Sequence, residues 1–113
     1  MTKIAVVGAG SWGTALSAVL SKKLHDVCLW AFEPQVAQQI TEGRENLSYL
    51  PGVELPENLR STADLATALR GAEVVVSVSP AQVVGSVMGE AAAHIRDDAL
   101  IVSASKGIET KTL

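Results

Sequence analysis

Short apolar runs alternate with mixed polar stretches along this 113-residue chain. The runs occupy residues 4–7, 27–31, 72–78 and 99–103, and turn-forming or polar residues bound each of them. Continuous apolar runs of this length are typical of strands that are buried on both faces of a sheet. The pattern therefore predicts four or five buried strands.

The residues between the first two runs have the spacing of a helix. Apolar side chains recur there at i, i+3, i+4, i+7 and i+8, which is the spacing of one helix face. They are Trp12, Ala15, Leu16, Val19 and Leu20. Lys22 and Lys23 follow, and positive charge is favoured at a helix C-terminus. We therefore predict a helix with one apolar face, on which Trp12 anchors the core while its indole N–H can face the rim of a cofactor site.

Helical patterns also follow the second and third runs. Pro34 is suited to the first turn of a helix that Gly43 can end. Residues 44–60 contain several proline and glycine breakers and are expected to be irregular. Beyond them, a short helix over residues 62–69 and a longer one over residues 83–95 are predicted. Either Ser61 or Thr62 is expected to cap the short helix, and Gly71 to close it.

Strands and helices therefore alternate throughout the chain. This alternation predicts an α/β fold of the Rossmann type, with a doubly wound parallel sheet. A complete fold of this type has six strands in two halves. Because the chain accounts for only four or five, we expect the sheet to be truncated before its last strands.

A glycine-rich sequence, GxGxxG, lies between the first predicted strand and the first predicted helix. Gly8 allows a tight turn, Gly10 leaves space for a pyrophosphate, and Gly13 lets the helix pack close to the sheet. Backbone N–H groups of the first helical turn, which begins near Ser11, have no partner within the helix. They point at the phosphates, and the helix dipole favours negative charge there. The alternative is an ordinary glycine-rich turn that binds no ligand.

An acidic residue, Glu33, follows Gly13 by 20 residues and ends the second apolar run. In dinucleotide-binding folds a carboxylate at this place accepts hydrogen bonds from the ribose 2′-hydroxyl. Its charge opposes a 2′-phosphate, and no arginine stands beside it. The sequence therefore predicts NAD as the cofactor, with NADP disfavoured. Phe32, next to Glu33, is either a ring that stacks on the adenosine or an ordinary apolar residue at a strand end.

Composition excludes several other classes of function. The net charge is −3, and the nine basic residues form no cluster, so we expect no nucleic-acid partner. Three glycines interrupt the N-terminal apolar stretch, which argues against a secretory signal, and no stretch is long enough to cross a membrane. The single cysteine, Cys28, cannot form an intrachain disulfide, which fits a reducing, cytoplasmic location. Neither His25 nor His94 has partners at metal-ligand spacing, so no metal site is predicted.

Four short motifs, in order, make the chain resemble the N-terminal domain of glycerol-3-phosphate dehydrogenases. They are Gly8-Ala9-Gly10-Ser11-Trp12-Gly13, Asn46-Leu47-Ser48-Tyr49-Leu50-Pro51-Gly52, Pro80-Ala81-Gln82 and Ser105-Lys106-Gly107-Ile108-Glu109. The resemblance covers essentially all of the chain. It implies that residues 1–113 are an incomplete N-terminal dinucleotide-binding domain, whose C-terminal substrate domain is absent from this chain.

The resemblance also implies a reaction and a set of site residues. Hydride passes between C2 of sn-glycerol 3-phosphate and C4 of the nicotinamide, which interconverts this substrate with dihydroxyacetone phosphate. No catalytic residue is expected in the chain, because the general-base lysine of the family lies in the C-terminal domain. A homodimer is expected for the full-length protein. Lys106 is expected to contact substrate as well as cofactor. The residues expected to bind cofactor are Gly8, Gly10, Ser11, Trp12, Gly13, Phe32, Glu33, Tyr49, Pro80 and Lys106.

Three alternatives to this interpretation stay open from the sequence. Another two-domain dehydrogenase, of the ketopantoate or 6-phosphogluconate type, shares GxGxxG but is not expected to carry the other motifs. A non-catalytic nucleotide-sensing module fits the short chain. A methyltransferase can also carry glycine-rich turns, and binding of NAD would separate it from a dehydrogenase.

Overall fold

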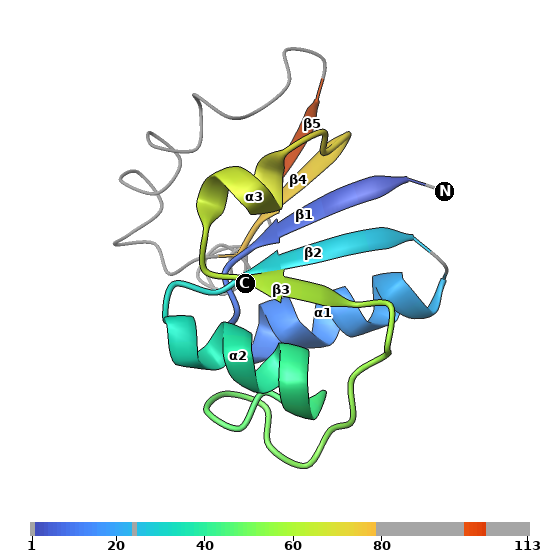
Figure 1. Cartoon of the computed structure of the whole chain (residues 1–113). Helices are drawn as coiled ribbons and strands as arrows, with labels where there is room; N and C mark the ends of the chain where they lie inside the picture. Colours follow the sequence, from blue (N-terminus) through green and yellow to red (C-terminus); the bar gives the residue numbers. More distant parts are fainter. Residues whose placement is uncertain (1, 24, 79–98, 104–113) are drawn as a thin grey trace, which may run out of the picture.

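The structure is a computed structural model, and it describes residues 2–23, 25–78 and 99–103. Within these residues the chain forms a parallel sheet with helices on both faces (Figure 1). The elements in chain order are β1 (Lys3–Val7), α1 (Ser11–Lys22), β2 (Asp26–Trp30), α2 (Pro34–Gly43), β3 (Arg60–Thr62), α3 (Leu65–Leu69), β4 (Val74–Ser77) and β5 (Leu100–Ser103). The predicted α/β fold with a doubly wound parallel sheet is thus confirmed.

The strand order places the middle of the sheet at β1. The order is β3-β2-β1-β4-β5, and every neighbouring pair is parallel. The chain therefore builds β2 and β3 on one side of β1, and then returns to add β4 and β5 on the other side. Ligands of open α/β sheets bind outside the carboxyl ends of the strands at such a reversal. In this sheet the reversal lies between β1 and β4.

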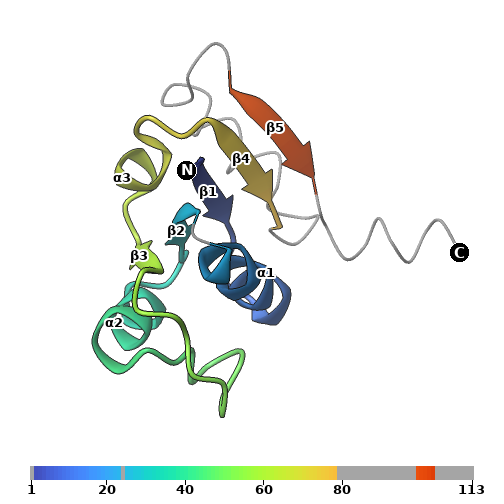
Figure 2. The same cartoon turned by 90° about the vertical axis from the view of Figure 1, so that its right-hand side faces the viewer.

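Two apolar clusters cover the two faces of the sheet. Successive side chains of a strand point to opposite faces, and β1 shows this directly. Ile4 and Val6 pack in a cluster that includes residues of α1 and α2, whereas Ala5 and Val7 pack in a cluster that includes α3. Figure 2 shows α1 and α2 on one side of the sheet and α3 on the other. Burial on both faces explains why the strands read as continuous apolar runs.

The buried face of α1 differs from the predicted apolar stripe. Trp12 is 43% exposed and Val19 is 52% exposed, so the prediction that Trp12 anchors the core is wrong. The reason is the close approach of α1 to the sheet near Gly13, which leaves room only for small side chains. The buried residues of the helix are Gly13, Thr14, Ser17, Ala18 and Ser21. Leu16 and Leu20 lie at the margin of this face and pack partly against the core.

A short strand, β3, and the start of α3 were not predicted. Thr62 belongs to β3, and the N-cap of α3 is Asp64, so neither Ser61 nor Thr62 caps the helix. Ser61 instead donates a hydrogen bond from its hydroxyl to the Leu29 carbonyl, 2.8 Å away in the neighbouring strand. The other strands match their predicted positions to within two residues, and the bounds of α2 are those predicted. The helix predicted over residues 83–95 lies outside the described residues.

The irregular segment between α2 and β3 lies against the helices rather than away from them. Arg44 adopts a left-handed conformation, with φ 56°, where α2 ends. Its guanidinium donates to the Leu59 carbonyl at 2.7 Å. Asn58 donates to the Ser21 carbonyl of α1 at 2.9 Å. These contacts bring the segment alongside α1, as the green loop in Figure 1 shows. Across the described ranges, no helix combines the length and the apolar character that spanning a bilayer requires.

Candidate functional site

The glycine-rich turn lies at the carboxyl end of β1, where the strand order reverses. Gly8 has φ 123°, a backbone conformation that residues other than glycine rarely adopt. Its N–H donates to the Trp30 carbonyl at the end of β2, at 3.1 Å. On the other side, the Val78 N–H donates to the Val7 carbonyl at 2.9 Å. The turn is therefore held between the ends of β2 and β4, which is the position that a dinucleotide site requires.

Gly10 and Gly13 have opposite surroundings. A Cβ built on Gly10 meets no atom within 4 Å, and the backbone there is extended, with φ −72° and ψ −173°. A Cβ on Gly13 would lie 1.9 Å from the Gly8 carbonyl oxygen and 2.7 Å from a methyl group of Val78. The fold thus needs glycine at position 13 but leaves open space at position 10. This difference fits the roles that the sequence predicted, with Gly13 for packing and Gly10 for a ligand.

The open space at Gly10 adjoins the N-terminus of α1. Gly10 is the N-cap residue, and no side chain caps the helix there. The first helical residues are Ser11, Trp12 and Gly13, and the backbone N–H groups of the first turn of an α-helix point out of its N-terminus. Because α1 runs for 12 residues, its dipole places partial positive charge at this end. The arrangement suits the two phosphates of a dinucleotide.

A buried asparagine ties the loop after α2 to the glycine-rich turn. Asn46 is 0% exposed. Its Nδ2 donates to the Ala9 carbonyl at 2.9 Å and to Thr14 Oγ1 at 2.8 Å. Its Oδ1 accepts a hydrogen bond from the Tyr49 N–H at 3.1 Å, and its own carbonyl accepts one from the Leu50 N–H at 2.8 Å. One side chain therefore fixes both the turn and the start of the loop.

The end of β2 carries the predicted acidic residue. Glu33 is the N-cap residue of α2, but its side chain does not cap the helix. Its carboxylate instead accepts a hydrogen bond from the Tyr49 hydroxyl. This hydrogen bond raises the pKa of Tyr49 above its ordinary value of 10.0, so the hydroxyl remains a donor throughout the neutral range. Glu33 and Tyr49, both predicted to bind cofactor, thus lie together although 16 residues separate them.

Phe32 lies on the surface beside Glu33. Its side chain is 72% exposed, so it contributes little to the core. The ring packs edge to face against Trp30, with ring centroids 5.9 Å apart and an interplanar angle of 89°. Trp30 is fixed in turn, because its indole N–H donates to the Ala63 carbonyl at 3.0 Å. An exposed ring on a rigid support is suited to stacking against a planar group.

Two predicted residues, Pro80 and Lys106, lie outside the described residues. What the structure does place is the end of β5, at Ser103, three positions before Lys106. Because β5 is parallel to β4, its carboxyl end is at the same edge of the sheet as the glycine-rich turn. The strand that precedes Lys106 therefore ends on the side that the prediction requires.

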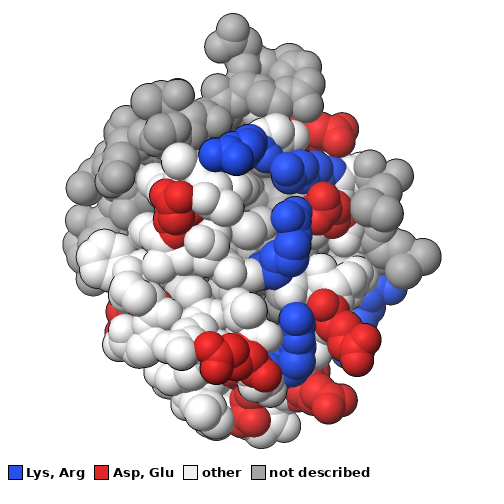
Figure 3. Space-filling model, in the orientation of Figure 1, with Lys and Arg blue, Asp and Glu red and all other residues white. Residues whose placement is uncertain are grey.

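The described residues give little support for a nucleophilic thiol, a metal site or a nucleic-acid surface. Burial raises the pKa of the Cys28 thiol above its ordinary value of 9.0, so the thiol stays protonated and is a poor nucleophile. No group of three or more histidine, cysteine, aspartate or glutamate side chains is gathered for a metal there. On the face shown in Figure 3, Lys and Arg are interspersed with Asp and Glu. Among the described residues, Arg60 forms an ion pair with Asp26 at 2.6 Å. This face lacks the uniform basic charge of a nucleic-acid surface.

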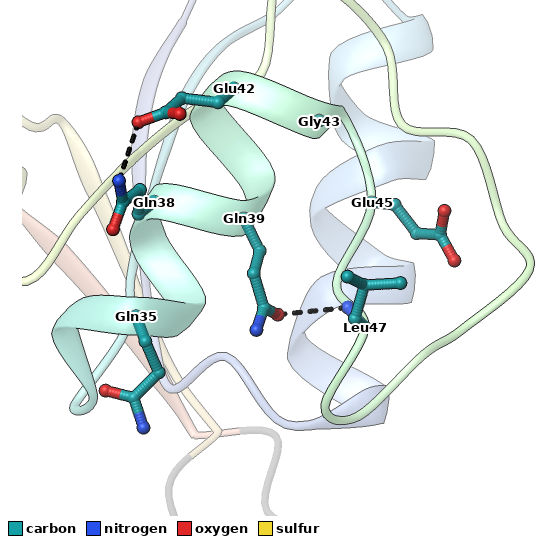
Figure 4. A pocket seen from close by; sticks show the side chains of 7 residues that line it. All are labelled: Gln35, Gln38, Gln39, Glu42, Gly43, Glu45 and Leu47. Atoms are coloured by element: carbon teal, nitrogen blue, oxygen red, sulfur yellow. Dashed lines mark hydrogen bonds between the residues drawn. The ribbon is translucent and has the colours of Figure 1, made fainter.

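An open groove lies between α2 and the loop that follows it (Figure 4). Amide and carboxylate side chains line most of it. Gln38 donates to the Glu42 carboxylate at 2.9 Å, and Gln39 accepts a hydrogen bond from the Leu47 N–H at 3.1 Å. The lining residues are Gln35, Gln38, Gln39, Glu42, Gly43, Glu45 and Leu47. None of them is a predicted site residue.

Sequence reasoning missed the roles of Asn46 and Thr14. Neither residue was predicted to contribute to the site, although Asn46 belongs to one of the four motifs. A signal was present for Thr14, since small residues recur at positions 14, 17, 18 and 21, which is the i, i+3, i+4, i+7 spacing of one helix face. That stripe marks the side of α1 that lies close to the sheet. A loop asparagine such as Asn46 carries no comparable local signal.

Comparisons with known proteins agree with this geometry. Residues 3–113 match the family model described as the NAD-dependent glycerol-3-phosphate dehydrogenase N-terminus. A glycerol-3-phosphate dehydrogenase [NAD(P)+] of Citrifermentans bemidjiense is 51% identical over 111 residues, which cover 98% of this chain and 33% of that protein. One from Bacillus licheniformis is 44% identical over 113 residues and is likewise covered over 33% of its length. This chain thus spans about a third of the length of these relatives.

Solved structures give the same result. The crystal structure of a glycerol-3-phosphate dehydrogenase from Coxiella burnetii superimposes with a TM-score of 0.87 at 33% sequence identity, over 93% of this chain and 32% of that one. A ketopantoate reductase from Ralstonia eutropha JMP134 superimposes with a TM-score of 0.72 at 24% identity, over 96% of this chain and 35% of that one. At that identity the second likeness supports the fold alone.

Proposed function

Because this chain belongs to the family of the NAD-dependent glycerol-3-phosphate dehydrogenase N-terminus, we propose that it forms the dinucleotide-binding part of such an enzyme. The reaction would interconvert sn-glycerol 3-phosphate and dihydroxyacetone phosphate by hydride transfer. One observation of the structure carries the proposal. In the turn at the reversal of strand order, Gly13 packs so closely against Gly8 that no side chain fits there. Gly10, in contrast, adjoins open space beside the N-terminus of α1.

Each part of the site has a role in this proposal. Gly8 forms the turn, and the space at Gly10 receives the pyrophosphate against the backbone N–H groups of Ser11, Trp12 and Gly13. Phe32 and Glu33 contact the adenosine, with Tyr49 beside them. Pro80 and Lys106 contact the nicotinamide end, and Lys106 also contacts the substrate. The bound nicotinamide supplies the group that accepts or gives the hydride.

Glu33 supports a preference for NAD over NADP. A carboxylate accepts hydrogen bonds and donates none when ionised, so it matches a 2′-hydroxyl and repels a 2′-phosphate. No arginine stands at position 32 or 34, where Phe32 and Pro34 lie. The names of the relatives allow either cofactor. For this chain we propose the more specific statement that NAD binds more tightly than NADP.

Catalysis needs groups beyond those described. No described residue near the turn is placed as a general base, and we propose that the base comes from outside these 113 residues. Lys106 would donate to the substrate oxygen and stabilise the negative charge that develops there as hydride leaves. A cytoplasmic location and a homodimer of the full-length protein belong to the same proposal. The buried, unbridged Cys28 is compatible with a reducing compartment.

Titration of the protein with NAD and with NADP by calorimetry tests this proposal. We expect NAD to bind more tightly. The double substitution Phe32→Arg and Glu33→Ser should reverse the preference, because it removes the carboxylate and adds a phosphate-binding guanidinium. Tighter binding of NADP by the unaltered protein would contradict the proposed specificity. Failure to bind either dinucleotide would contradict the proposed function itself.

The isolated 113-residue chain offers a second test, on activity. We expect it to bind NADH but not to oxidise it in the presence of dihydroxyacetone phosphate, because the base and most of the substrate contacts are missing. Measurable turnover by the purified chain would show that the catalytic groups lie within these residues after all.

A further inference from the structure

The loop that follows α2 reaches both ends of the candidate site. At one end, Asn46 donates to the Ala9 carbonyl within the glycine-rich turn, at 2.9 Å. Three residues later, the Tyr49 hydroxyl donates to the carboxylate of Glu33 at the end of β2. The two ends are thus connected by one short piece of chain. Any role for this loop must account for both contacts.

Hydrogen bonds to Asn46 fix the backbone of Tyr49. The asparagine is fully buried, and its Oδ1 accepts the Tyr49 N–H at 3.1 Å, while its backbone carbonyl accepts the Leu50 N–H at 2.8 Å. Its amide is held in turn by Ala9 and Thr14. The backbone of Tyr49 is therefore fixed relative to the turn, and its ring extends from a rigid base toward Glu33.

Glu33 has little else in the described structure to orient it. As the N-cap residue of α2 it makes no hydrogen bond from its side chain to the helix. Glutamate has several rotatable bonds, and ordering such a side chain on binding costs conformational entropy. The tyrosine hydroxyl occupies one carboxylate oxygen. An ionised carboxylate has about four acceptor positions, so a ribose hydroxyl can still be accepted.

We propose that Tyr49 is a positioning residue, which holds the Glu33 carboxylate ready to accept the adenosine 2′-hydroxyl and thereby sets the preference for NAD over NADP. This inference rests on the proposed function. It assigns to Tyr49 an action through Glu33, which differs from a direct contact with the cofactor. Holding the acceptor in place before binding raises affinity for a ligand with a 2′-hydroxyl. It also keeps the negative charge where a 2′-phosphate would lie.

The substitution Tyr49→Phe removes the hydroxyl and keeps the ring. In the protein at its full natural length, we expect affinity for NAD to fall by about three- to tenfold, the scale of the net contribution of one ordinary hydrogen bond. Affinity for NADP should change less or rise, because the freed carboxylate can turn away from a 2′-phosphate. The ratio of the two dissociation constants should therefore move toward NADP. Calorimetric titration with each dinucleotide measures it.

Two further variants separate this action from a general effect on the loop. Gln39→Ala removes a different hydrogen bond to the same loop, at the Leu47 N–H, and does not touch Glu33. We expect it to leave the NAD to NADP ratio unchanged. In a Glu33→Ala background, Tyr49→Phe should cause no further change in that ratio, because the group on which the hydroxyl acts is gone.

The outcomes divide cleanly. A shift of the ratio in Tyr49→Phe that disappears in the Glu33→Ala background supports the inference. An unchanged ratio overturns it, and so does an equal shift in both backgrounds, which would mean direct contact of Tyr49 with the cofactor. A ratio that shifts equally in Gln39→Ala overturns it as well, in favour of a loop effect. If the unaltered protein binds neither dinucleotide, the proposed function fails and the inference fails with it.

Discussion

A methyl group at position 13 would meet backbone rather than open space. In Gly13→Ala the new Cβ would lie 1.9 Å from the Gly8 carbonyl oxygen, far inside contact distance. The oxygen cannot easily move away, because Gly8 has φ 123° and its N–H is bonded to the Trp30 carbonyl at 3.1 Å. The remaining way to relieve the contact is to shift α1 away from the sheet, which would loosen the packing of its small, buried side chains.

The expected cost follows from these contacts. Overpacking in a closely packed region costs about 1–3 kcal/mol, and the short contact with a backbone atom places this substitution at the upper end. Loss of the hydrogen bond at Gly8 adds about 1 kcal/mol. The better helix propensity of alanine stabilises the folded state by about 1 kcal/mol and offsets part of this loss. We therefore expect Gly13→Ala to lower the free energy of unfolding by about 3 kcal/mol, which corresponds to roughly 10 °C in Tm.

Gly10→Val is the matched control, because a Cβ at position 10 meets no atom within 4 Å. We expect it to cost about 1 kcal/mol of stability, from the poor N-cap propensity of valine, and to abolish NAD binding by filling the space of the pyrophosphate. Thermal unfolding followed by circular dichroism and calorimetric titration with NAD measure the two effects. A Gly13→Ala protein as stable as the unaltered one would refute the packing argument. A Gly10→Val protein that melts as early as Gly13→Ala would show that Gly10 is structural too.

Three other predictions concern the loop and the substrate end of the site. Asn46→Ala should lower the free energy of unfolding by about 2–4 kcal/mol, because it leaves buried polar partners unsatisfied, and urea titration checks this. Tyr49 is the only tyrosine of the chain, so phenolate absorbance should show its pKa above 10.0, and Glu33→Ala should return it toward that value. Because the folded pKa is the raised one, any stabilisation by this hydrogen bond is present below pH 10.0 and is lost as the pH rises through the folded value. In the full-length enzyme, Lys106→Ala should lower kcat/KM for glycerol 3-phosphate by about 10²-fold and NAD affinity far less; near-normal kinetics would make Lys106 an ordinary surface lysine.

The parts of the fold that sequence could predict are those that depend on local chemistry. The apolar runs located four of the five described strands, because strands buried on both faces must be apolar along their length. The roles of Gly8 and Gly13 were also predictable, since each follows from what a short strand–turn–helix connection requires. The bounds of α2 followed from Pro34 and Gly43 in the same way.

The parts that sequence could not predict depend on distances between elements. The apolar stripe of α1 was assigned to the core because periodicity gives a face but not how closely the helix approaches the sheet. At close approach only small residues fit, so Thr14 and Ser17 are buried while Trp12 and Val19 are exposed. The three residues of β3 are too few to show a period of two, and their strand conformation depends on pairing with β2.

The two ends of the candidate site differ in the same respect. The proposed pyrophosphate end is made by backbone within six consecutive residues, so its shape depends little on the rest of the chain. The proposed ribose end depends on side chains from separate segments. Glu33 contacts Tyr49, and the loop that carries Tyr49 is held against the glycine-rich turn by the hydrogen bond from Asn46 to Ala9, 37 positions earlier in the chain. NAD and NADP are identical at the first end and differ only at the second. A protein that keeps its glycine-rich turn can therefore change its cofactor preference through the loop alone, without altering the contacts that bind the phosphates common to both cofactors.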